Sequence, residues 1–220
     1  MPDSSTATER ETVRRPLFAN VLYPRFRKAA EESGEHEFRE RLLEGLSGRV
    51  LELGCGDGAH FRLYPETVGE LVGVEPEENL LKRAEAAAAD ARCPVRIVPG
   101  FAEALPAGDG EFDAAVAALV LCSVDDPQTA LAELMRVVRP GGELRFFEHV
   151  RADARPHVAA QLLVQPLWAQ LGGGCHIARD TEQAIRDAGF EIERIERFDF
   201  APGLLQKLAG PHILGVARRP

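Results

Sequence analysis

The sequence predicts an α/β fold with a doubly wound, mostly parallel sheet of seven strands, and three observations support it. First, five short apolar runs have the composition of buried strands, at 50–54, 71–75, 95–100, 112–119 and 142–150. Second, the stretch 77–91 is rich in strong helix formers, and the stretch 127–138 places apolar side chains on one helical face. Third, residues 190–200 and 211–219 alternate in polarity, which is typical of an antiparallel strand pair. Because strands alternate with helices, we expect right-handed crossovers and helices on both faces of the sheet.

The segment before the first strand is predicted to be helical. Apolar residues recur at helical spacing over 17–26 and again over 38–46. We therefore expect residues 1–46 to form an N-terminal helical lid, followed by a core of residues 47–220.

The fifth strand is followed by an expected insertion, residues 151–180. Its main element is an apolar helix over 157–171, which we expect Pro166 to break, and a flexible GGGCH connection follows at 172–176. The next helix is expected to begin at Asp180 or Thr181 and to end at Gly189.

Length, composition and charge limit the classes of protein to which the chain can belong. Its 220 residues, 45% hydrophobic and 28% charged, are typical of a single globular domain. The net charge of −9 repels phosphate backbones, so a nucleic-acid partner is not expected. The basic cluster Arg25, Arg27 and Lys28 is interpreted as a solvated helix face in preference to an anion site.

The cysteines predict no metal and no disulfide framework. The chain has four of them, Cys55, Cys93, Cys122 and Cys175, without a CxxC pair or a Cys/His spacing that suits zinc. Reduced thiols favour a cytoplasmic location. Residues 1–15 are polar and no run of about 18 apolar residues occurs, so neither export nor a membrane span is expected.

A glycine-rich turn between the first strand and the next helix is the strongest local motif. Residues 52–58 read ELGCGDG, and glycines there let a backbone approach a ligand and expose amide donors. The pattern alone is ambiguous, because Gly54, Gly56 and Ala59 also satisfy the dinucleotide motif GxGxxG/A. An NAD-dependent oxidoreductase therefore stays open at this point.

Two acidic residues narrow the choice of ligand. Glu75 closes the second strand, 19 residues after Gly56, where a carboxylate can accept both ribose hydroxyls of an adenosine. Glu52 stands just before the glycines, where it would repel a pyrophosphate but attract the cationic amino group of a methionine. The charge pattern thus favours S-adenosylmethionine as the cofactor, with S-adenosylhomocysteine as the product.

Residues after the third and fourth strands complete the predicted cofactor site. Glu103 is placed to accept the adenine amino group and Ala102 to offer a backbone amide to the ring, although Glu103 also fits an ordinary surface carboxylate. Leu119, with Val120, would form an apolar floor under the cofactor, or plain core.

Five motifs in register resemble those of the class I S-adenosylmethionine-dependent methyltransferases. They are LELGCGDGAH, GVEPEENLL, AEALP, FDAAVAALVLCSVDDP and RVVRPGGELRFFEHV, within residues 45–200. The resemblance implies a Rossmann-like methyltransferase fold in which 47–220 binds the cofactor and 151–180 lies on the substrate side. The implied cofactor-binding residues are Glu52, Gly54, Cys55, Gly56, Glu75, Pro76, Ala102, Glu103 and Leu119.

Within that class the chain is most similar to the methyltransferase-like thiol S-methyltransferases, through LELGCGDGAHFRLYP, LVLCSV, LRFFEHV and GGGCHIAR. This resemblance implies a small, apolar acceptor with thiol sulfur preferred. The animal members carry an N-terminal hydrophobic segment, from which the polar residues 1–15 depart, so a soluble relative is expected. A monomer or weak homodimer is expected, and the alternatives are an O- or C-methyltransferase on a phenol, quinone or other natural product, or a non-catalytic cofactor-binding regulator.

Methyl transfer from a sulfonium requires mainly alignment and exclusion of water, and a thiol is already partly ionised near neutral pH. The candidates for a base are Tyr23, His149 and His176, of which His149 is preferred, with Tyr23 second. Asp126, followed by a proline, is interpreted as a helix cap in preference to a metal ligand. We expect a hydrophobic substrate chamber bordered by Cys122, Ser123 and Cys175 and built from Leu17, Phe18, Leu162, Leu163, Leu167 and Trp168.

Overall fold

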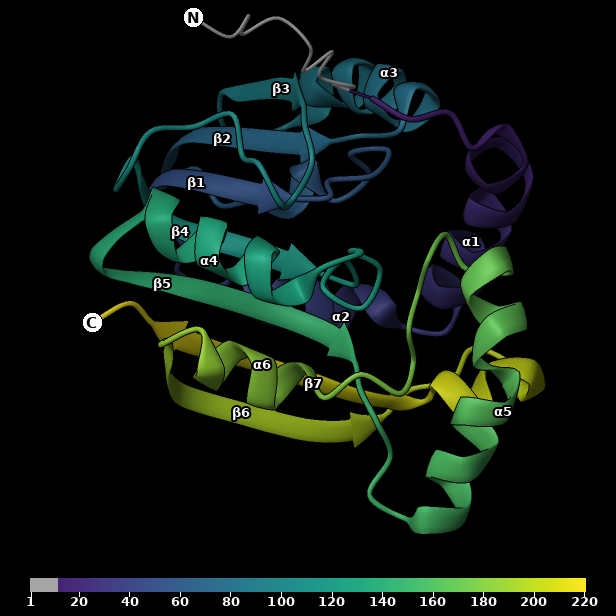
Figure 1. Cartoon of the computed structure of the whole chain (residues 1–220). Helices are drawn as coiled ribbons and strands as arrows, with labels where there is room; N and C mark the ends of the chain where they lie inside the picture. Colours follow the sequence, from purple (N-terminus) through teal and green to yellow (C-terminus); the bar gives the residue numbers. More distant parts are fainter. Residues whose placement is uncertain (1–11) are drawn as a thin grey trace, which may run out of the picture.

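The computed structural model describes residues 12–220, apart from the side chains of 204 and 205. Its centre is one seven-stranded sheet with the strand order β3-β2-β1-β4-β5-β7-β6 (Figure 1). The parallel strands are β1 (Gly48–Leu53), β2 (Val68–Glu75), β3 (Val95–Pro99), β4 (Phe112–Ala118) and β5 (Val138–His149). β6 (Glu191–Asp199) and β7 (Pro211–Arg218) add the antiparallel part, because β7 runs antiparallel to both β5 and β6. The predicted fold class is confirmed.

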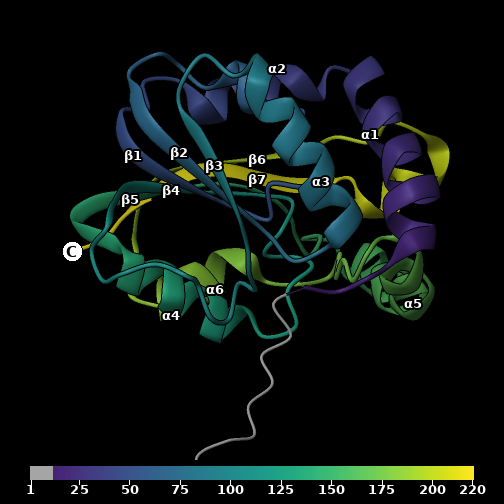
Figure 2. The ribbon, with the colours of Figure 1, turned by 90° about the horizontal axis from the view of Figure 1, so that it is seen from above.

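Helices cover both faces of the sheet, as the alternation of elements predicts (Figure 2). One face carries α2 (Glu35–Leu43) and α3 (Glu78–Ala87), and the other carries α4 (Pro127–Val137) and α6 (Thr181–Asp187). Short helical turns occur at η2 (Phe61–Leu63), η3 (Ala88–Asp90) and η4 (Leu204–Ala209). The core strands of the sheet are buried on both sides, which explains their continuous apolar runs.

Local capping explains where the sheet-covering helices begin. The Asp126 carboxylate accepts hydrogen bonds from the amides of Gln128 and Thr129, with Pro127 in the first turn of α4. The interpretation of Asp126 as a cap is therefore confirmed. Asp180 caps α6 in the same way through the amide of Gln183, which settles the choice between the two predicted start residues.

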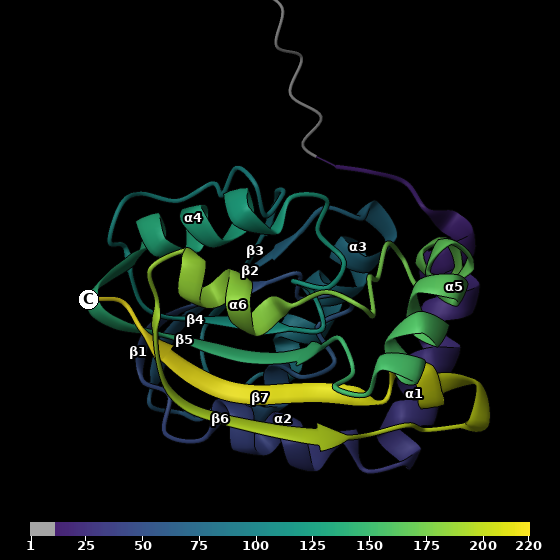
Figure 3. The same ribbon diagram turned by 60° about the horizontal axis from the view of Figure 1, so that its bottom comes forward.

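The remaining helices lie beyond the carboxyl ends of the parallel strands. η1 (Phe18–Leu22) leads into α1 (Tyr23–Glu32), and α5 (Arg155–Leu171) stands at the same end of the sheet (Figures 1 and 3). In open α/β sheets this end is where ligands bind. The role of the N-terminal helices as a lid stays a prediction, and its residues 1–11 lie outside the described residues.

The expected break at Pro166 is wrong, because α5 continues as one helix on both sides of it. A proline inside a helix removes one amide donor and crowds the preceding turn, and packing against neighbouring segments must offset that cost. Gln161 supplies such an anchor: it is fully buried, accepts from the amide of Ala152 at 2.9 Å and donates to the carbonyls of Ile177 and Leu208 at 3.0 Å each. In the described part of the chain, no helix has both the length and the apolar composition to cross a membrane.

Candidate active site

A cavity of about 340 Å³ opens at the carboxyl ends of the parallel strands. Every residue predicted to bind the cofactor or to act in catalysis lines it, including Glu52, Pro76, Cys55 and both candidate bases Tyr23 and His149. Volumes of this order are typical of small-molecule sites. The structure thus brings the predicted residues together from six segments of the chain.

The glycine turn after β1 is shaped by contacts that only glycine permits. Gly54 has a φ of +60°, and a Cβ there would lie 2.4 Å from Cγ2 of Val120. Gly56 has a φ of +61°, and its Cβ would lie 2.4 Å from the hydroxyl oxygen of Tyr23. Side chains therefore close on the turn from the sheet and from α1, and the backbone forms the cavity wall.

Glu75 ends β2 with its carboxylate fixed by backbone amides. Its Oε2 accepts from the Gly56 amide and its Oε1 from the Glu77 amide, both at 2.9 Å. Burial raises the pKa of Glu75 to about 7 despite these two hydrogen bonds. The hydrogen bonds hold the carboxylate against the glycine turn, and each oxygen keeps a second lone pair for a ligand.

Glu52 is only 4% exposed, and its Oε2 has no hydrogen-bond partner among the described residues. Burial raises the pKa of Glu52 to about 7, an effect that the nearby Arg39 guanidinium reduces. An unpartnered buried acceptor is costly in a folded protein. Glu52 lines the cavity, so this oxygen is available to a donor or cation that a ligand would bring.

Basic residues lie beside the glycine turn, where the sequence did not predict them. Arg39 of α2 is 8% exposed and lines the cavity with His60, whose pKa burial holds well below its usual value. Arg27 was interpreted as part of a solvated face, which is wrong for this residue, because its Nε lies 3.1 Å from Oδ2 of Asp57 in the glycine turn. α1 and α2 approach the turn only in the folded chain, so no local pattern identifies these residues.

The opposite part of the cavity follows β3 and β4. Ala102 is buried there, and Glu103, half-buried, accepts from the Asp126 amide at 3.3 Å through Oε1. Leu119 is a non-glycine residue with a φ of +58°, a strained conformation that clusters at functional sites. Its amide donates to the Phe147 carbonyl at 2.7 Å, which holds β4 to β5 at the cavity rim.

A buried carboxylate that the sequence analysis missed shapes the turn after β4. Glu148 of β5 is fully buried and accepts from the amides of Val120, Leu121 and Cys122 at 3.0, 2.8 and 3.1 Å. Burial raises the pKa of Glu148, and these three hydrogen bonds oppose that rise. The carboxylate thus accepts the amide hydrogen bonds that a neighbouring strand accepts within a sheet.

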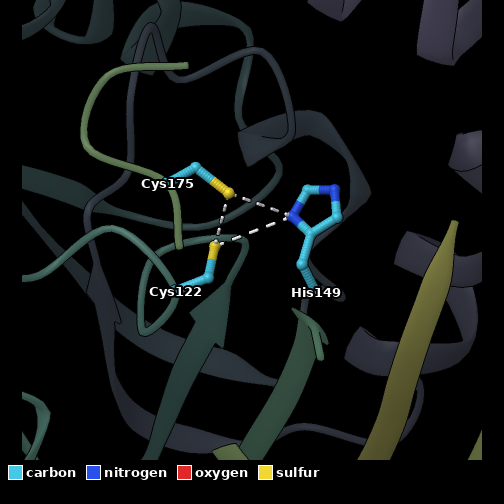
Figure 4. A group of neighbouring side chains, drawn as sticks. All are labelled: Cys122, His149 and Cys175. Carbon is cyan, nitrogen blue, oxygen red and sulfur yellow. Dashed lines mark hydrogen bonds between the residues drawn. The ribbon is translucent and has the colours of Figure 1, made fainter. Parts of the chain in front are cut away.

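His149 meets two cysteines at the end of β5. Its Nδ1 lies 3.6 Å from both the Cys122 and the Cys175 sulfur, and the two sulfurs are 3.5 Å apart (Figure 4). Burial lowers the pKa of His149, but the Cys175 sulfur and then the Glu148 and Glu35 charges raise it, and the net shift is upward. The hydrogen bond between the two sulfurs is the main cause that holds the pKa of Cys175 well below its usual value. His176 does not line the cavity; its amide donates to the Cys122 carbonyl.

The apolar wall is narrower than the predicted substrate chamber. Phe18 and Trp168 line the cavity, and the GGG turn packs between them: a Cβ on Gly173 would meet Phe18 at 2.4 Å, and one on Gly172 would lie 3.3 Å from Nε1 of Trp168. The expected connection is thus a packed turn, with Gly174 also hydrogen-bonded to Ala169. The other predicted chamber residues face outward, which is a correction: Leu17, Leu162, Leu163 and Leu167 are 59–82% exposed.

Tyr23 reaches the glycine turn from α1. Its hydroxyl lies 3.4 Å from Oδ1 of Asp57, and its ring packs edge-on against Phe18. Burial, followed by the Asp57 charge, raises the pKa of Tyr23. The phenol therefore stays protonated near neutral pH and acts as a donor, which argues against Tyr23 as a base.

Comparison with known proteins decides the family. Residues 51–146 match the methyltransferase domain family. The chain is 34% identical over 212 residues to thiol S-methyltransferase TMT1B from Homo sapiens, which covers 92% of this chain and 84% of that protein. The chain belongs to the class I S-adenosylmethionine-dependent methyltransferases.

The methyltransferase is also 35% identical to thiol S-methyltransferase TMT1A from Homo sapiens over 193 residues, 84% of this chain and 78% of that protein. A methyltransferase structure from Thermotoga maritima, described as a possible histamine N-methyltransferase, shares its fold with a TM-score of 0.70 at 22% identity, covering 93% of this chain and 99% of that one. A second, from Bacillus halodurans, gives a TM-score of 0.68 at 18% identity over 88% and 98% of the two chains.

The cavity of the methyltransferase fits S-adenosylmethionine by two observations. The unpartnered Oε2 of Glu52 would offer an acceptor to the cationic methionine end, and Gly54 and Gly56 line the cavity with backbone alone, which a ligand can approach closely. The oxidoreductase interpretation of the same glycines does not agree with the family.

Proposed function

We propose that this methyltransferase transfers the methyl group of S-adenosylmethionine to the sulfur of a small, apolar thiol. The supporting observation is a single cavity in which the glycine turn faces Phe18, Trp168 and the sulfur-rich corner at Cys175. The relatives named as thiol S-methyltransferases support the same acceptor.

In this proposal the acidic residues orient the cofactor. Glu52 binds the methionine amino group, Glu75 accepts from the ribose hydroxyls, and Glu103 accepts from the adenine amino group. Pro76, Cys55, Ala102 and Leu119 shape the space around the nucleoside. A preorganised set of acceptors would hold the cofactor in one orientation, as methyl transfer requires.

On the acceptor side, Phe18 and Trp168 exclude water and bind the apolar part of the thiol. His149 and Tyr23 are the proposed polar groups near the reacting sulfur. The thiol loses its proton to solvent, and the resulting thiolate sulfur attacks the methyl carbon as the bond from methyl to sulfonium breaks, giving a thioether and S-adenosylhomocysteine. A thiol with a pKa near 8.5 needs less help from a base than an alcohol does, which suits a cavity with few polar groups at this end.

Matched acceptor pairs test the proposal. S-adenosylhomocysteine release is measured with alkanethiols and alkanols of equal chain length, with thiophenol and phenol, and with a quinone and an amine. We expect turnover with the thiols and a rise in kcat/KM of roughly fourfold for each added methylene until the cavity is full.

Each other result has a distinct meaning. Preferred turnover of the phenol or quinone would replace sulfur by oxygen or carbon as the accepting atom. Tight S-adenosylmethionine binding by calorimetry without turnover of any acceptor would favour the non-catalytic regulator and contradict the proposal.

A further inference from the structure

Three soft donor atoms converge where the proposed acceptor would lie. They come from segments far apart in the sequence: Cys122 follows β4, His149 ends β5 and Cys175 lies in the turn after α5. The two sulfurs are 3.5 Å apart and each lies 3.6 Å from Nδ1 of His149 (Figure 4). Among the described residues these are the one group of three or more such side chains close enough to share a metal ion.

The spacing matches one face of a tetrahedral zinc site. With Zn–S bonds of about 2.3 Å and Zn–N bonds of about 2.0–2.1 Å, neighbouring ligand atoms of a tetrahedron lie roughly 3.4–3.8 Å apart. Both S···N distances of 3.6 Å match the value for a sulfur and a nitrogen, and the S···S distance of 3.5 Å is about 0.3 Å shorter than the roughly 3.8 Å of an ideal tetrahedron. A Zn²⁺ ion can therefore contact all three atoms without a change of backbone.

The backbone around both cysteines is held in place. The amide of Cys122 donates to the Glu148 carboxylate at 3.1 Å, and its carbonyl accepts from the amide of His176 at 2.6 Å. The carbonyl of Cys175 accepts from the Gln165 amide group at 3.0 Å. Ligands supported by such a second layer of hydrogen bonds are preorganised for a metal.

Burial and charge agree with a bound dication. Cys122 is fully buried and Cys175 is 5% exposed. Two buried thiolates would repel each other, whereas Zn²⁺ between them gives a group with no net charge. Without a metal ion, the same residues would be packed as neutral thiols, and a Zn²⁺ titration distinguishes the two states.

The cluster is open on the cavity side. His149 and Cys175 line the cavity, whereas Cys122 lies behind them. A three-ligand site of this kind keeps its fourth position for water or substrate, as catalytic zinc sites do.

We propose that Cys122, His149 and Cys175 bind one Zn²⁺ ion whose fourth position receives the acceptor thiol. The role in acceptor binding rests on the proposed function, whereas metal binding itself does not. On binding, the thiol loses its proton to solvent and keeps its electron pair as a zinc-bound thiolate. That sulfur then forms the bond to the methyl carbon as the bond from methyl to sulfonium breaks. The thioether product carries no charge and leaves the ion.

Metal binding is measured on the full chain, purified with a reductant. After removal of metal by a chelator, Zn²⁺ is titrated against a chromophoric competitor, and Co²⁺ is used as a spectroscopic probe. We expect one Zn²⁺ per chain and a thiolate-to-cobalt charge-transfer band. Cys122→Ser and Cys175→Ser should each weaken Zn²⁺ binding at least about 100-fold.

Cys93→Ser is the matched control, since Cys93 is also buried but lies before β3, and it should keep full Zn²⁺ affinity. Calorimetry with S-adenosylhomocysteine shows whether each variant is folded. Zn²⁺ should also protect two cysteines of the unmodified chain from alkylation, a readout that needs no variant.

Uptake by the unmodified chain no greater than that of the Cys122→Ser/Cys175→Ser double variant would overturn the proposal. So would a Cys122–Cys175 disulfide that persists in reductant, because it leaves no thiolates for the ion. If Zn²⁺ binds but no thiol is methylated, only the proposed function fails. If thiols are methylated equally well after metal removal, the role of the ion in acceptor binding fails.

Discussion

The Glu148 carboxylate accepts a 2.8 Å hydrogen bond from the backbone amide of Leu121, although 27 residues separate them along the chain. The same carboxylate also binds the neighbouring amides of Val120 and Cys122. One side chain therefore sets the path of the turn that carries both the predicted cofactor floor and a sulfur of the Cys122–His149–Cys175 cluster.

Glu148→Gln is expected to destabilise the fold by about 1–3 kcal/mol, because the new amide group turns donors toward backbone donors in a buried site. Urea unfolding followed by circular dichroism measures the change. Glu191→Gln on the exposed side of β6 is the control and should stay within about 0.5 kcal/mol. Equal effects of the two substitutions would contradict the role of Glu148.

Cofactor affinity should rise with pH through neutrality. The pKa of Glu52 is about 7 in the free protein, and its ionised form attracts the cationic amino group of S-adenosylhomocysteine. Below pH 7, protonation of Glu52 should weaken cofactor binding by up to about tenfold for each pH unit, and above pH 7 the affinity should reach a plateau. Calorimetry at pH values from about 5.5 to 8 measures this dependence of cofactor affinity on pH. Glu52→Gln should flatten the profile and weaken binding above pH 7. An identical slope in the variant would show that Glu52 does not bind the amino group of the cofactor.

The cofactor-free protein should lose stability as pH rises. An unfolded glutamate ionises near its ordinary pKa of 4.5, whereas buried Glu52 keeps its proton until about pH 7. The raised pKa therefore contributes fully to the free energy of unfolding below the unfolded-state pKa. Up to about 3 kcal/mol of that free energy is lost as the pH rises to 7, and above pH 7 no further loss is expected from this group. Thermal unfolding of the chain and of Glu52→Gln checks this, since the variant should lack that part of the loss.

Gly54→Ala should lower the free energy of unfolding by more than its positive φ alone explains, because the new Cβ would lie 2.4 Å from Val120. Gly45→Ala is the matched control: Gly45 has a φ of +74° but nothing within 4 Å of its Cβ position. We expect the control to lose about 1–2 kcal/mol of unfolding free energy and Gly54→Ala to lose at least about 1 kcal/mol more. Gly54→Ala should also bind the cofactor more weakly. Val120→Ala should partly restore the Gly54→Ala variant. Unfolding free energies and cofactor titrations measure both, and no rescue would mean that the contact does not limit the turn.

Trp168→Ala and Leu163→Ala should separate the cavity wall from the outer face of α5. Trp168 lines the cavity, whereas Leu163 is 82% exposed. Loss of Trp168 should raise the KM for long-chain thiols more than for short ones, by roughly tenfold or more, because it removes apolar contact area. Leu163→Ala should leave both constants unchanged within about twofold. An equal effect of the two would place Leu163 back in the acceptor chamber.

Local sequence determined most of what is regular in this protein. The apolar runs fixed five parallel strands, the alternation over 190–219 fixed the antiparallel pair, and the acid-flanked glycines with Glu75 indicated the cofactor. These features depend on residues near one another along the chain, through hydrogen-bonding period and backbone freedom.

Only the tertiary structure decided which distant residues meet. The sheet brings the ends of β4 and β5 to one edge and α5 returns to it, so Cys122, His149 and Cys175, 26 and 27 residues apart, come within 3.6 Å. The spacing along the chain carries no sign of that contact. In the same way, α5 has apolar residues on more than one face, and its docking, in which Gln161 is buried, placed Trp168 at the cavity and Leu163 outward. Side-chain periodicity fixes a helix, but the burial of its faces depends on the long-range packing around it.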